Sequence, residues 1–184
     1  MSHKVLLPSL NFSQVIELPL GKITIGMTSE AVNDPEAFPE GAPTVTIPAS
    51  QNDLYFFIFS DPKNKVLPIR IQPVNIDNEI LKIGETMWFN FSERDLAAKL
   101  GKAKMAIKAK KRAISKPPLT KSGYYLAQFV YKEDGGSQYL PIMKKSWWFD
   151  EYSKNIGFII DTGARMPKIY TFRDRRWAKP KTDL

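Results

Sequence analysis

The chain has 184 residues and a formal net charge of +8, and 43% of its residues are hydrophobic and 12% aromatic. It contains no cysteine and one histidine, His3, so disulfides, zinc–thiolate sites, thiol nucleophiles and serine–histidine hydrolysis have almost no side chains to use. We therefore expect no catalytic centre, no cofactor and no metal site, and we predict that the protein is not an enzyme.

The first part of the chain predicts short strands separated by a long loop. Apolar residues alternate with polar ones at 23–27, as in a half-buried strand, and a shorter strand is expected at 45–47. Residues 28–43 contain three prolines, four acidic residues and no basic one, which indicates a long, exposed, acidic loop. The apolar run at 54–59 is typical of a central strand, whereas two prolines favour an edge strand near 67–71.

The middle of the chain predicts one short helix near 93–100. Ser92 can cap this helix, Asp95 completes a capping-box pattern, and Gly101 is placed to end it. Two interpretations stay open for residues 102–115, which either continue the helical stripe or form a strand. We favour the strand.

Strand patterns dominate the second half of the chain. Strands are predicted at 87–91, 105–107, 124–131, 139–143, 156–160 and 168–172. Asp134-Gly135-Gly136-Ser137 predicts a hairpin turn between two of them. Residues 173–184 form a basic C-terminal tail.

Many short strands, regular turns and one short helix indicate an all-β, mostly antiparallel fold of the sandwich type. We predict a single sandwich domain over residues 1–184, because the segment that precedes the acidic loop is too short for a domain of its own. The sequence contains no apolar run long enough to span a membrane, and no targeting segment is visible in it.

Asp161-Thr162-Gly163, after the strand at 156–160, resembles the active-site turn of retroviral-type aspartic proteases. Those enzymes need two such aspartates that share a proton. The sequence has no second Asp-Thr-Gly, and only 23 residues follow Asp161. We therefore interpret the motif as a turn between the strands at 156–160 and 168–172.

Positive charge is concentrated in the second half of the chain. Residues 1–92 carry six basic and ten acidic side chains, whereas residues 93–184 carry 21 and nine. The stretch 99–121 is basic throughout and contains no acidic residue. Such a stretch attracts phosphate backbones or anionic surfaces, and it is also typical of a solvated strand face whose lysines prevent aggregation. Our candidate partner contacts within it are Lys104, Lys108, Lys110, Lys111 and Arg112.

Trp147 and Trp148 are the second set of candidate contacts. Neighbouring residues of an extended segment point to opposite faces, so one indole is expected in the core and the other on the surface. An exposed indole can stack on a sugar ring or on a cationic side chain.

Residues 84–173 contain a series of short motifs in a characteristic order. They are Gly84-Glu85, Trp88-Phe89-Asn90-Phe91-Ser92, Leu100-Gly101, Pro117-Pro118, Tyr125, Trp147-Trp148-Phe149 and Ile159-Ile160-Asp161. This order resembles that of small exported all-β proteins of unknown function from verrucomicrobial bacteria, one of which is immunoglobulin-like and encoded beside pilus-like genes in a mucin-dwelling gut species. The resemblance implies an immunoglobulin-like sandwich and an exported protein of the periplasm, outer membrane or cell surface. The cysteine pair and tryptophan spacing of true immunoglobulin domains are absent here.

Together, these observations predict a non-enzymatic structural or interaction protein of the bacterial cell envelope or secreted fraction, associated with a pilus or the outer membrane. We expect protein partners or self-association, in which the acidic loop at 28–43 pairs with the basic region at 99–121 of a neighbouring copy. The alternatives are a nucleic-acid-binding module that uses the same lysines and a carbohydrate-binding module that uses Trp147 or Trp148.

Overall fold

The computed structural model describes residues 2–9, 11–32, 34, 37–133, 136, 138–164 and 166–177. Regular structure in these residues is almost entirely β, which confirms the predicted all-β class. No helix in the described part of the chain is both long enough and apolar enough to cross a membrane.

The chain divides into two compact units, Met1–Ile80 and Leu81–Leu184, whereas the sequence predicts one domain. The difference arises because each sheet is built from strands of one unit only. The early strands pair among themselves and do not extend the later sheets.

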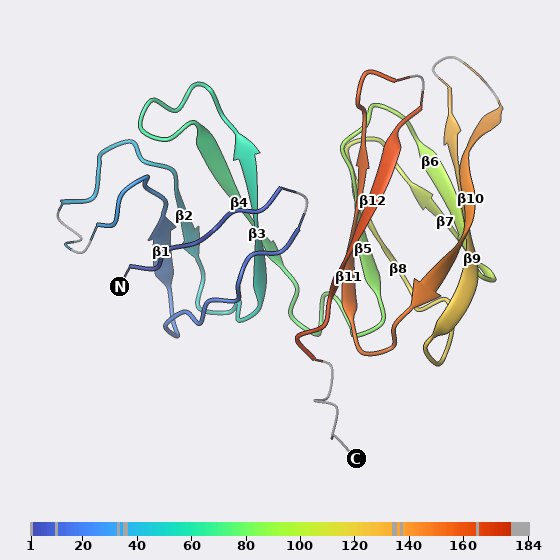
Figure 1. Cartoon of the computed structure of the whole chain (residues 1–184), viewed down its shortest axis with the longest axis horizontal. Coiled ribbons are helices and arrows are strands. Elements are labelled where there is room, and N and C mark those ends of the chain that lie inside the picture. Colours follow the sequence, from blue (N-terminus) through green and yellow to red (C-terminus); the bar gives the residue numbers. More distant parts are fainter. Residues whose placement is uncertain are drawn as a thin grey trace. The chain divides into compact units, whose positions relative to one another are not determined.

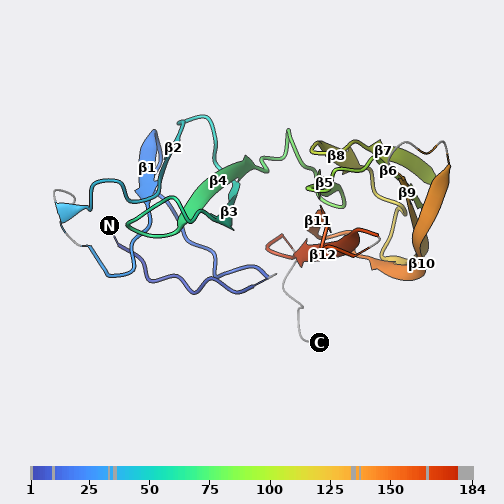
Figure 2. The same cartoon turned by 90° about the horizontal axis from the view of Figure 1, so that it is seen from above.

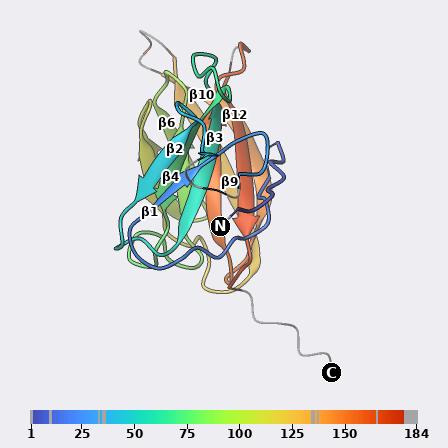
Figure 3. The same ribbon diagram turned by 90° about the vertical axis from the view of Figure 1, so that its left-hand side faces the viewer.

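The first unit contains two antiparallel strand pairs (Figures 1 and 3). β1 (Ile23–Gly26) pairs with β2 (Thr44–Ile47), and β3 (Leu54–Ser60) pairs with β4 (Ile69–Asn75). The positions of the strands predicted in this part of the chain are confirmed, and β4, which contains prolines in and before it as predicted for an edge strand, pairs only with β3 among the described residues. The prediction that residues 54–59 form a central strand is wrong, because β3 likewise pairs only with β4 in the described part of the chain. The predicted acidic loop at 28–43 connects β1 to β2, and part of it lies outside the described residues.

The second unit is a sandwich of two four-stranded sheets (Figure 2). Its strands are β5 (Thr86–Asn90), β6 (Leu96–Leu100), β7 (Ala103–Ile107), β8 (Arg112–Ser115), β9 (Gly123–Lys132), β10 (Tyr139–Phe149), β11 (Lys154–Ile160) and β12 (Lys168–Asp174). One sheet has the order β10-β9-β6-β7 and the other the order β12-β11-β5-β8. All neighbouring strands are antiparallel except β5 and β11, which run parallel. The predicted sandwich architecture is thus confirmed, and the immunoglobulin-like assignment stays a prediction.

The core lies between the two sheets and is centred on Trp88 of β5. The indole is 1% exposed, and its ring centroid lies 5.1 Å from that of Phe129 and 6.4 Å from that of Trp147. Its Nε1 donates a hydrogen bond to Ser115 Oγ at 3.1 Å, which satisfies the one polar group that burial removes from water. Gly157 on the neighbouring β11 faces the ring, and a Cβ added there would collide with it.

β5 and β11 are apolar on both faces. Alternation predicts that Phe89 shares a face of its strand with Met87, and Phe158 with Ile156, and the pairing of the two strands brings Phe89 and Phe158 to a common face with ring centroids 6.0 Å apart. The core between the sheets, however, takes the alternate residues Trp88 and Ile159. Alternation therefore locates these strands but does not identify the face that meets the core.

The prediction of a helix near 93–100 is wrong, because Leu96–Leu100 form the strand β6. β6 pairs with β7 on one side and with β9 on the other, and its three alternate apolar residues are buried. Residues spaced to share a helical face also satisfy a strand here, and pairing on both sides decides between them. Gly101, with φ of +61°, turns the chain from β6 into β7 instead of ending a helix. Residues 102–115 form β7 and β8, as we favoured.

Strand pairing also places the predicted turns of the second unit. Asp161 to Gly163 connect β11 to β12, as predicted, and β9 and β10 form the predicted hairpin. Asp134, Gly135 and Ser137 of the hairpin turn lie outside the described residues, as do residues 178–184 of the basic tail.

We predict that Gly157→Ala destabilises the second unit by about 1–3 kcal/mol, because the added Cβ needs space that the Trp88 ring occupies. Urea unfolding followed by tryptophan fluorescence measures the loss. Gly123→Ala is the matched control, since a Cβ there would make an ordinary contact 3.4 Å from Leu119 Cδ1. Equal losses in the two alanine variants would contradict the packing argument.

Candidate functional site

The five basic candidate contacts do not form one patch. Lys104 lies on β7 and points away from the core. Lys108, Lys110 and Lys111 lie on the connection from β7 to β8, and Arg112 begins β8. All five side chains are exposed. The predicted cluster is therefore split between a sheet face and a loop at the end of the strands.

Two of the loop lysines are held by carboxylates. Lys108 Nζ lies 2.7 Å from Asp95 Oδ2, and Lys110 Nζ lies 2.7 Å from Glu93 Oε1. Lys110 Nζ also donates a hydrogen bond to the carbonyl of Phe91 at 2.8 Å. Because these acidic residues offset the lysine charges, the loop attracts a phosphate backbone less strongly than the sequence suggests.

The pairing also shifts the titration of the two partners. The hydrogen bond from Lys108, together with one from the Ala109 amide at 2.9 Å, lowers the pKa of the Asp95 carboxyl. The same hydrogen bond raises the pKa of the Lys108 ammonium. Both groups therefore stay charged over a wider pH range than they would alone.

Asn90 ties together the connections at this end of the sandwich. Its buried Nδ2 donates hydrogen bonds to the carbonyls of Arg94, Ile107 and Lys108 at 2.8, 3.1 and 3.1 Å. Its Oδ1 accepts hydrogen bonds from the amide and hydroxyl of Ser92 at 3.0 and 2.7 Å. Ser92, predicted as a helix cap, belongs instead to this network, which fixes the loops to the strands.

Asp161, the aspartate of the protease-like motif, also serves this network. Its exposed Oδ2 accepts a hydrogen bond from the Glu93 amide at 3.2 Å, which holds Asp161 as part of the turn after β11.

Burial raises the pKa of the Tyr125 hydroxyl to about 12, against an opposing effect of Arg173. Tyr125 therefore loses its proton only at a higher pH than a tyrosine in water does.

Neither the cavity beside β12 nor the acidic side chains of the described residues form a second candidate site. The cavity, which is shallow and has a volume of about 260 Å³, has mostly apolar walls that include Ile142, Met166 and Tyr170. Within the described ranges, no group of three or more histidine, aspartate or glutamate side chains is placed to hold a metal ion.

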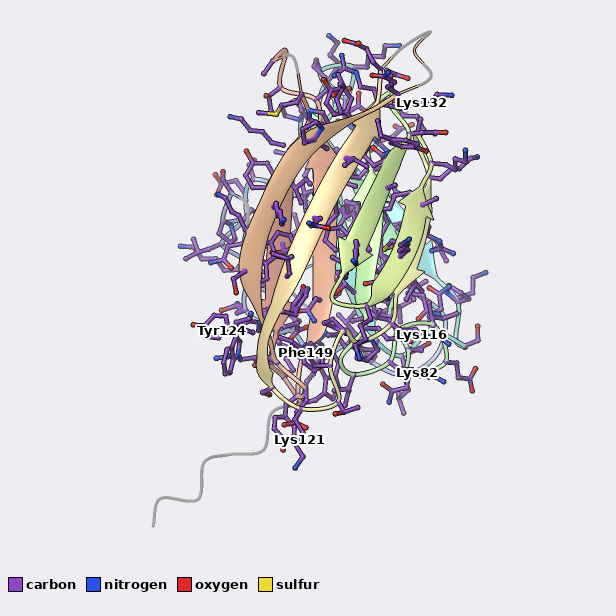
Figure 4. The ribbon with its side chains drawn as sticks, turned by 90° about the vertical axis from the view of Figure 1, so that its right-hand side faces the viewer. Lys82, Lys116, Lys121, Tyr124, Lys132 and Phe149 are labelled. Atoms are coloured by element: carbon purple, nitrogen blue, oxygen red, sulfur yellow. The ribbon has the colours of Figure 1, made fainter. Side chains whose placement is uncertain are left out.

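The outer face of the β10-β9-β6-β7 sheet is the most distinctive surface of the second unit. These four strands contain five lysines and neither aspartate nor glutamate. Figure 4 shows this face, with Lys132 and Tyr124 toward its two ends. We call the outward side chains of these strands the lysine face: Ala97, Lys99, Lys104, Ala106, Tyr124, Leu126, Gln128, Val130, Lys132, Tyr139, Pro141, Lys144, Ser146 and Trp148.

Three lysines of this face form one row across the four strands. The register places Lys104 opposite Lys99, Lys99 opposite Gln128, and Gln128 opposite Lys144. Strands spaced about 4.8 Å apart put the ends of the row roughly 14 Å from each other. None of the three lysines takes part in an ion pair within the part of the chain that the structure describes. Because like charges directly opposite each other destabilise a sheet, a bound anion would stabilise this row.

The two tryptophans lie on opposite faces of β10, as predicted. Trp147 packs inward against Phe129, with ring centroids 5.5 Å apart. Trp148 is 43% exposed and meets Tyr124, which is 71% exposed, edge to face at 4.9 Å. Arg173 holds the backbone beneath Trp148 by donating from Nη2 to its carbonyl at 2.8 Å. Of the two candidates, only Trp148 is exposed.

Our sequence reasoning did not select Lys99, Tyr124 or Lys144 for this surface. Alternation along the strand at 124–131 is enough to place Tyr124 outward. Alignment of Lys99 with Lys144 depends on the register of three strand pairs, and no local pattern in the sequence contains it.

No protein-family model matches the chain, and no curated protein matches its sequence. The case for a function accordingly rests on the geometry and charge of the lysine face.

We predict that Asp95→Asn destabilises the second unit by about 1 kcal/mol at neutral pH and has little effect at low pH. The folded-state pKa of Asp95 lies below its ordinary value of 3.8, so its stabilisation is complete above pH 3.8 and is lost as the pH falls through the folded-state pKa. Urea unfolding of both proteins from pH 7 downward tests this. Glu93→Gln is the control, since the Glu93 side chain is 74% exposed and its pair with Lys110 contributes little. An Asp95→Asn effect that is independent of pH would contradict the assignment.

Proposed function

We propose that the protein is a non-enzymatic interaction protein that binds an anionic partner through the lysine face. The observation that carries the proposal is the row Lys104–Lys99–Gln128–Lys144, which crosses a sheet whose strands contain no acidic residue. The resemblance to exported all-β proteins supports a place in the cell envelope or secreted fraction, in association with a pilus-like or outer-membrane assembly.

The placement of charge in the second unit supports this use of the face. Lys108 and Lys110 form ion pairs with carboxylates within the unit. The lysines of the row, in contrast, have only Gln128 or another lysine of the row directly opposite them on the neighbouring strands. A surface of one charge sign attracts oppositely charged partners and raises the rate at which they associate. The row therefore contributes to binding and gains stability when a partner is bound.

We predict that replacing Lys99, Lys104 and Lys144 by glutamine weakens binding to heparin, used as a general polyanion, about tenfold at low salt. Three lost contacts of roughly 0.5 kcal/mol each give this factor. Elution from a heparin column and titration calorimetry measure the change.

The matched control replaces Lys82, Lys116 and Lys121 by glutamine. These three exposed lysines lie toward the end of the strands in Figure 4, so the control alters net charge equally and leaves the lysine face intact. Comparable weakening in both triple variants would mean that only net charge matters, and the proposal would fail.

We also predict that Lys99→Glu acts in opposite directions on folding and binding. It turns the repulsive Lys99–Lys104 pair into an attractive one and should raise the free energy of unfolding by about 0.5 kcal/mol. It should also weaken heparin binding, because it places a negative charge at the middle of the row. Denaturation and column elution of this one variant test both expectations, and unchanged binding would refute the proposed role of the row.

A further inference from the structure

We infer that the anionic partner is an acidic polysaccharide, which lies along the lysine face from Trp148 and Tyr124 to the lysine row. This inference rests on the proposed function, since it names the partner that the same face takes. It is argued from the shape of the face, from its aromatic end and from the polar groups between the two ends.

The lysine face has the dimensions of a strip. It is about 14 Å wide across four strands, and from Tyr124 to Lys132 along β9 it is about 26 Å long. Its area of roughly 400 Å² is about half of what each partner contributes to a stable protein–protein interface. A strip of this size suits a linear chain better than the surface of a folded protein.

The aromatic end of the strip suits a sugar ring. Trp148 and Tyr124 are both exposed and lie edge to face at 4.9 Å, so the face of one ring is available beside the edge of the other. The C–H groups on one side of a sugar ring form an apolar surface that packs on such an aromatic face. The lysine row begins at Lys144, four residues along β10 from Trp148 and roughly 13 Å away.

Uncharged hydrogen-bonding groups lie between the two ends. Ser146 stands between Trp148 and Lys144 on β10, and Gln128 stands inside the lysine row. A hydroxyl and a carboxamide can each donate to and accept from sugar hydroxyls. The carboxylate or sulfate groups of an acidic polysaccharide would then meet Lys144, Lys99 and Lys104.

Single-stranded nucleic acid fits the same strip less well. Proteins that bind it on a sheet stack successive bases on aromatic side chains of the central strands. Here the central strands β9 and β6 present one outward aromatic residue, Tyr124, at the end of the strip. All cations on the four strands are lysines, which lack the planar fork that arginine offers to phosphate.

The experiment compares four probes with the full chain: polygalacturonate, neutral dextran, oligodeoxythymidylate and vesicles of anionic phospholipid. Titration calorimetry gives the affinity, and indole fluorescence reports on Trp148. We expect polygalacturonate to bind with a change in fluorescence that is absent in Trp148→Phe. We expect dextran not to bind, and the oligonucleotide and the vesicles to bind at least tenfold more weakly than polygalacturonate.

Two sets of variants separate this inference from the proposed function. Tyr124→Ala and Trp148→Ala should each weaken polygalacturonate binding about fivefold and leave weak oligonucleotide binding unchanged, and Trp148→Phe should retain most of the affinity. The glutamine triple variant at Lys99, Lys104 and Lys144 should weaken binding of every anionic probe. Circular dichroism and urea unfolding establish that each variant is folded.

The possible failures differ in kind. Tighter binding of the oligonucleotide or the vesicles than of polygalacturonate would overturn the polysaccharide inference and leave the anion-binding face standing. The same conclusion follows if the aromatic variants bind polygalacturonate like the original chain. If the lysine triple variant binds every probe unchanged, both the inference and the proposed function fail.

Discussion

The contact between the Trp88 and Trp147 indoles is the interaction on which the second unit depends. The two rings come from opposite sheets and stack with an interplanar angle of 17°. The space for Trp88 exists because its neighbour on β11 is Gly157, and its indole N–H is satisfied by Ser115. Three strands of one sheet therefore supply the indole at the centre of the sandwich, the space that it occupies and the hydrogen-bond acceptor for its N–H: β5, β11 and β8.

The same contact determines what the other sheet shows to its surroundings. Because Trp147 faces inward, the alternation of β10 turns Trp148, Ser146 and Lys144 outward. Pairing then aligns Lys144 with Gln128 of β9 and, through β6, with Lys99. The place of Lys144 in the row is therefore a consequence of core packing, because a shift of β10 by one residue would turn Trp147 outward and Trp148 inward.

The sequence was sufficient for the fold class and for most strands, because alternation and turn residues are local signals. It failed at 93–100, where leucines spaced four apart suit a helix, while Ala98 between them makes a strand equally good. It also selected Lys108 and Lys110, whose pairing with Asp95 and Glu93 joins residues 13 and 17 positions apart. Local patterns could place Trp148 on the surface, but only the register brings it onto the face that holds Lys99.

A protective role explains part of the lysine face, but not all of it. Lysines on edge strands prevent sheets from joining edge to edge, and Lys104 on β7 and Lys144 on β10 occupy the two edges. Lys99 is on β6, an interior strand, where its backbone is paired on both sides and no edge needs protection. It also faces Lys104 directly, where an acidic residue would favour folding. A position that sacrifices stability in this way is more easily understood as a binding position than as a structural one, so Lys99 is the residue that most strongly connects this face with a function.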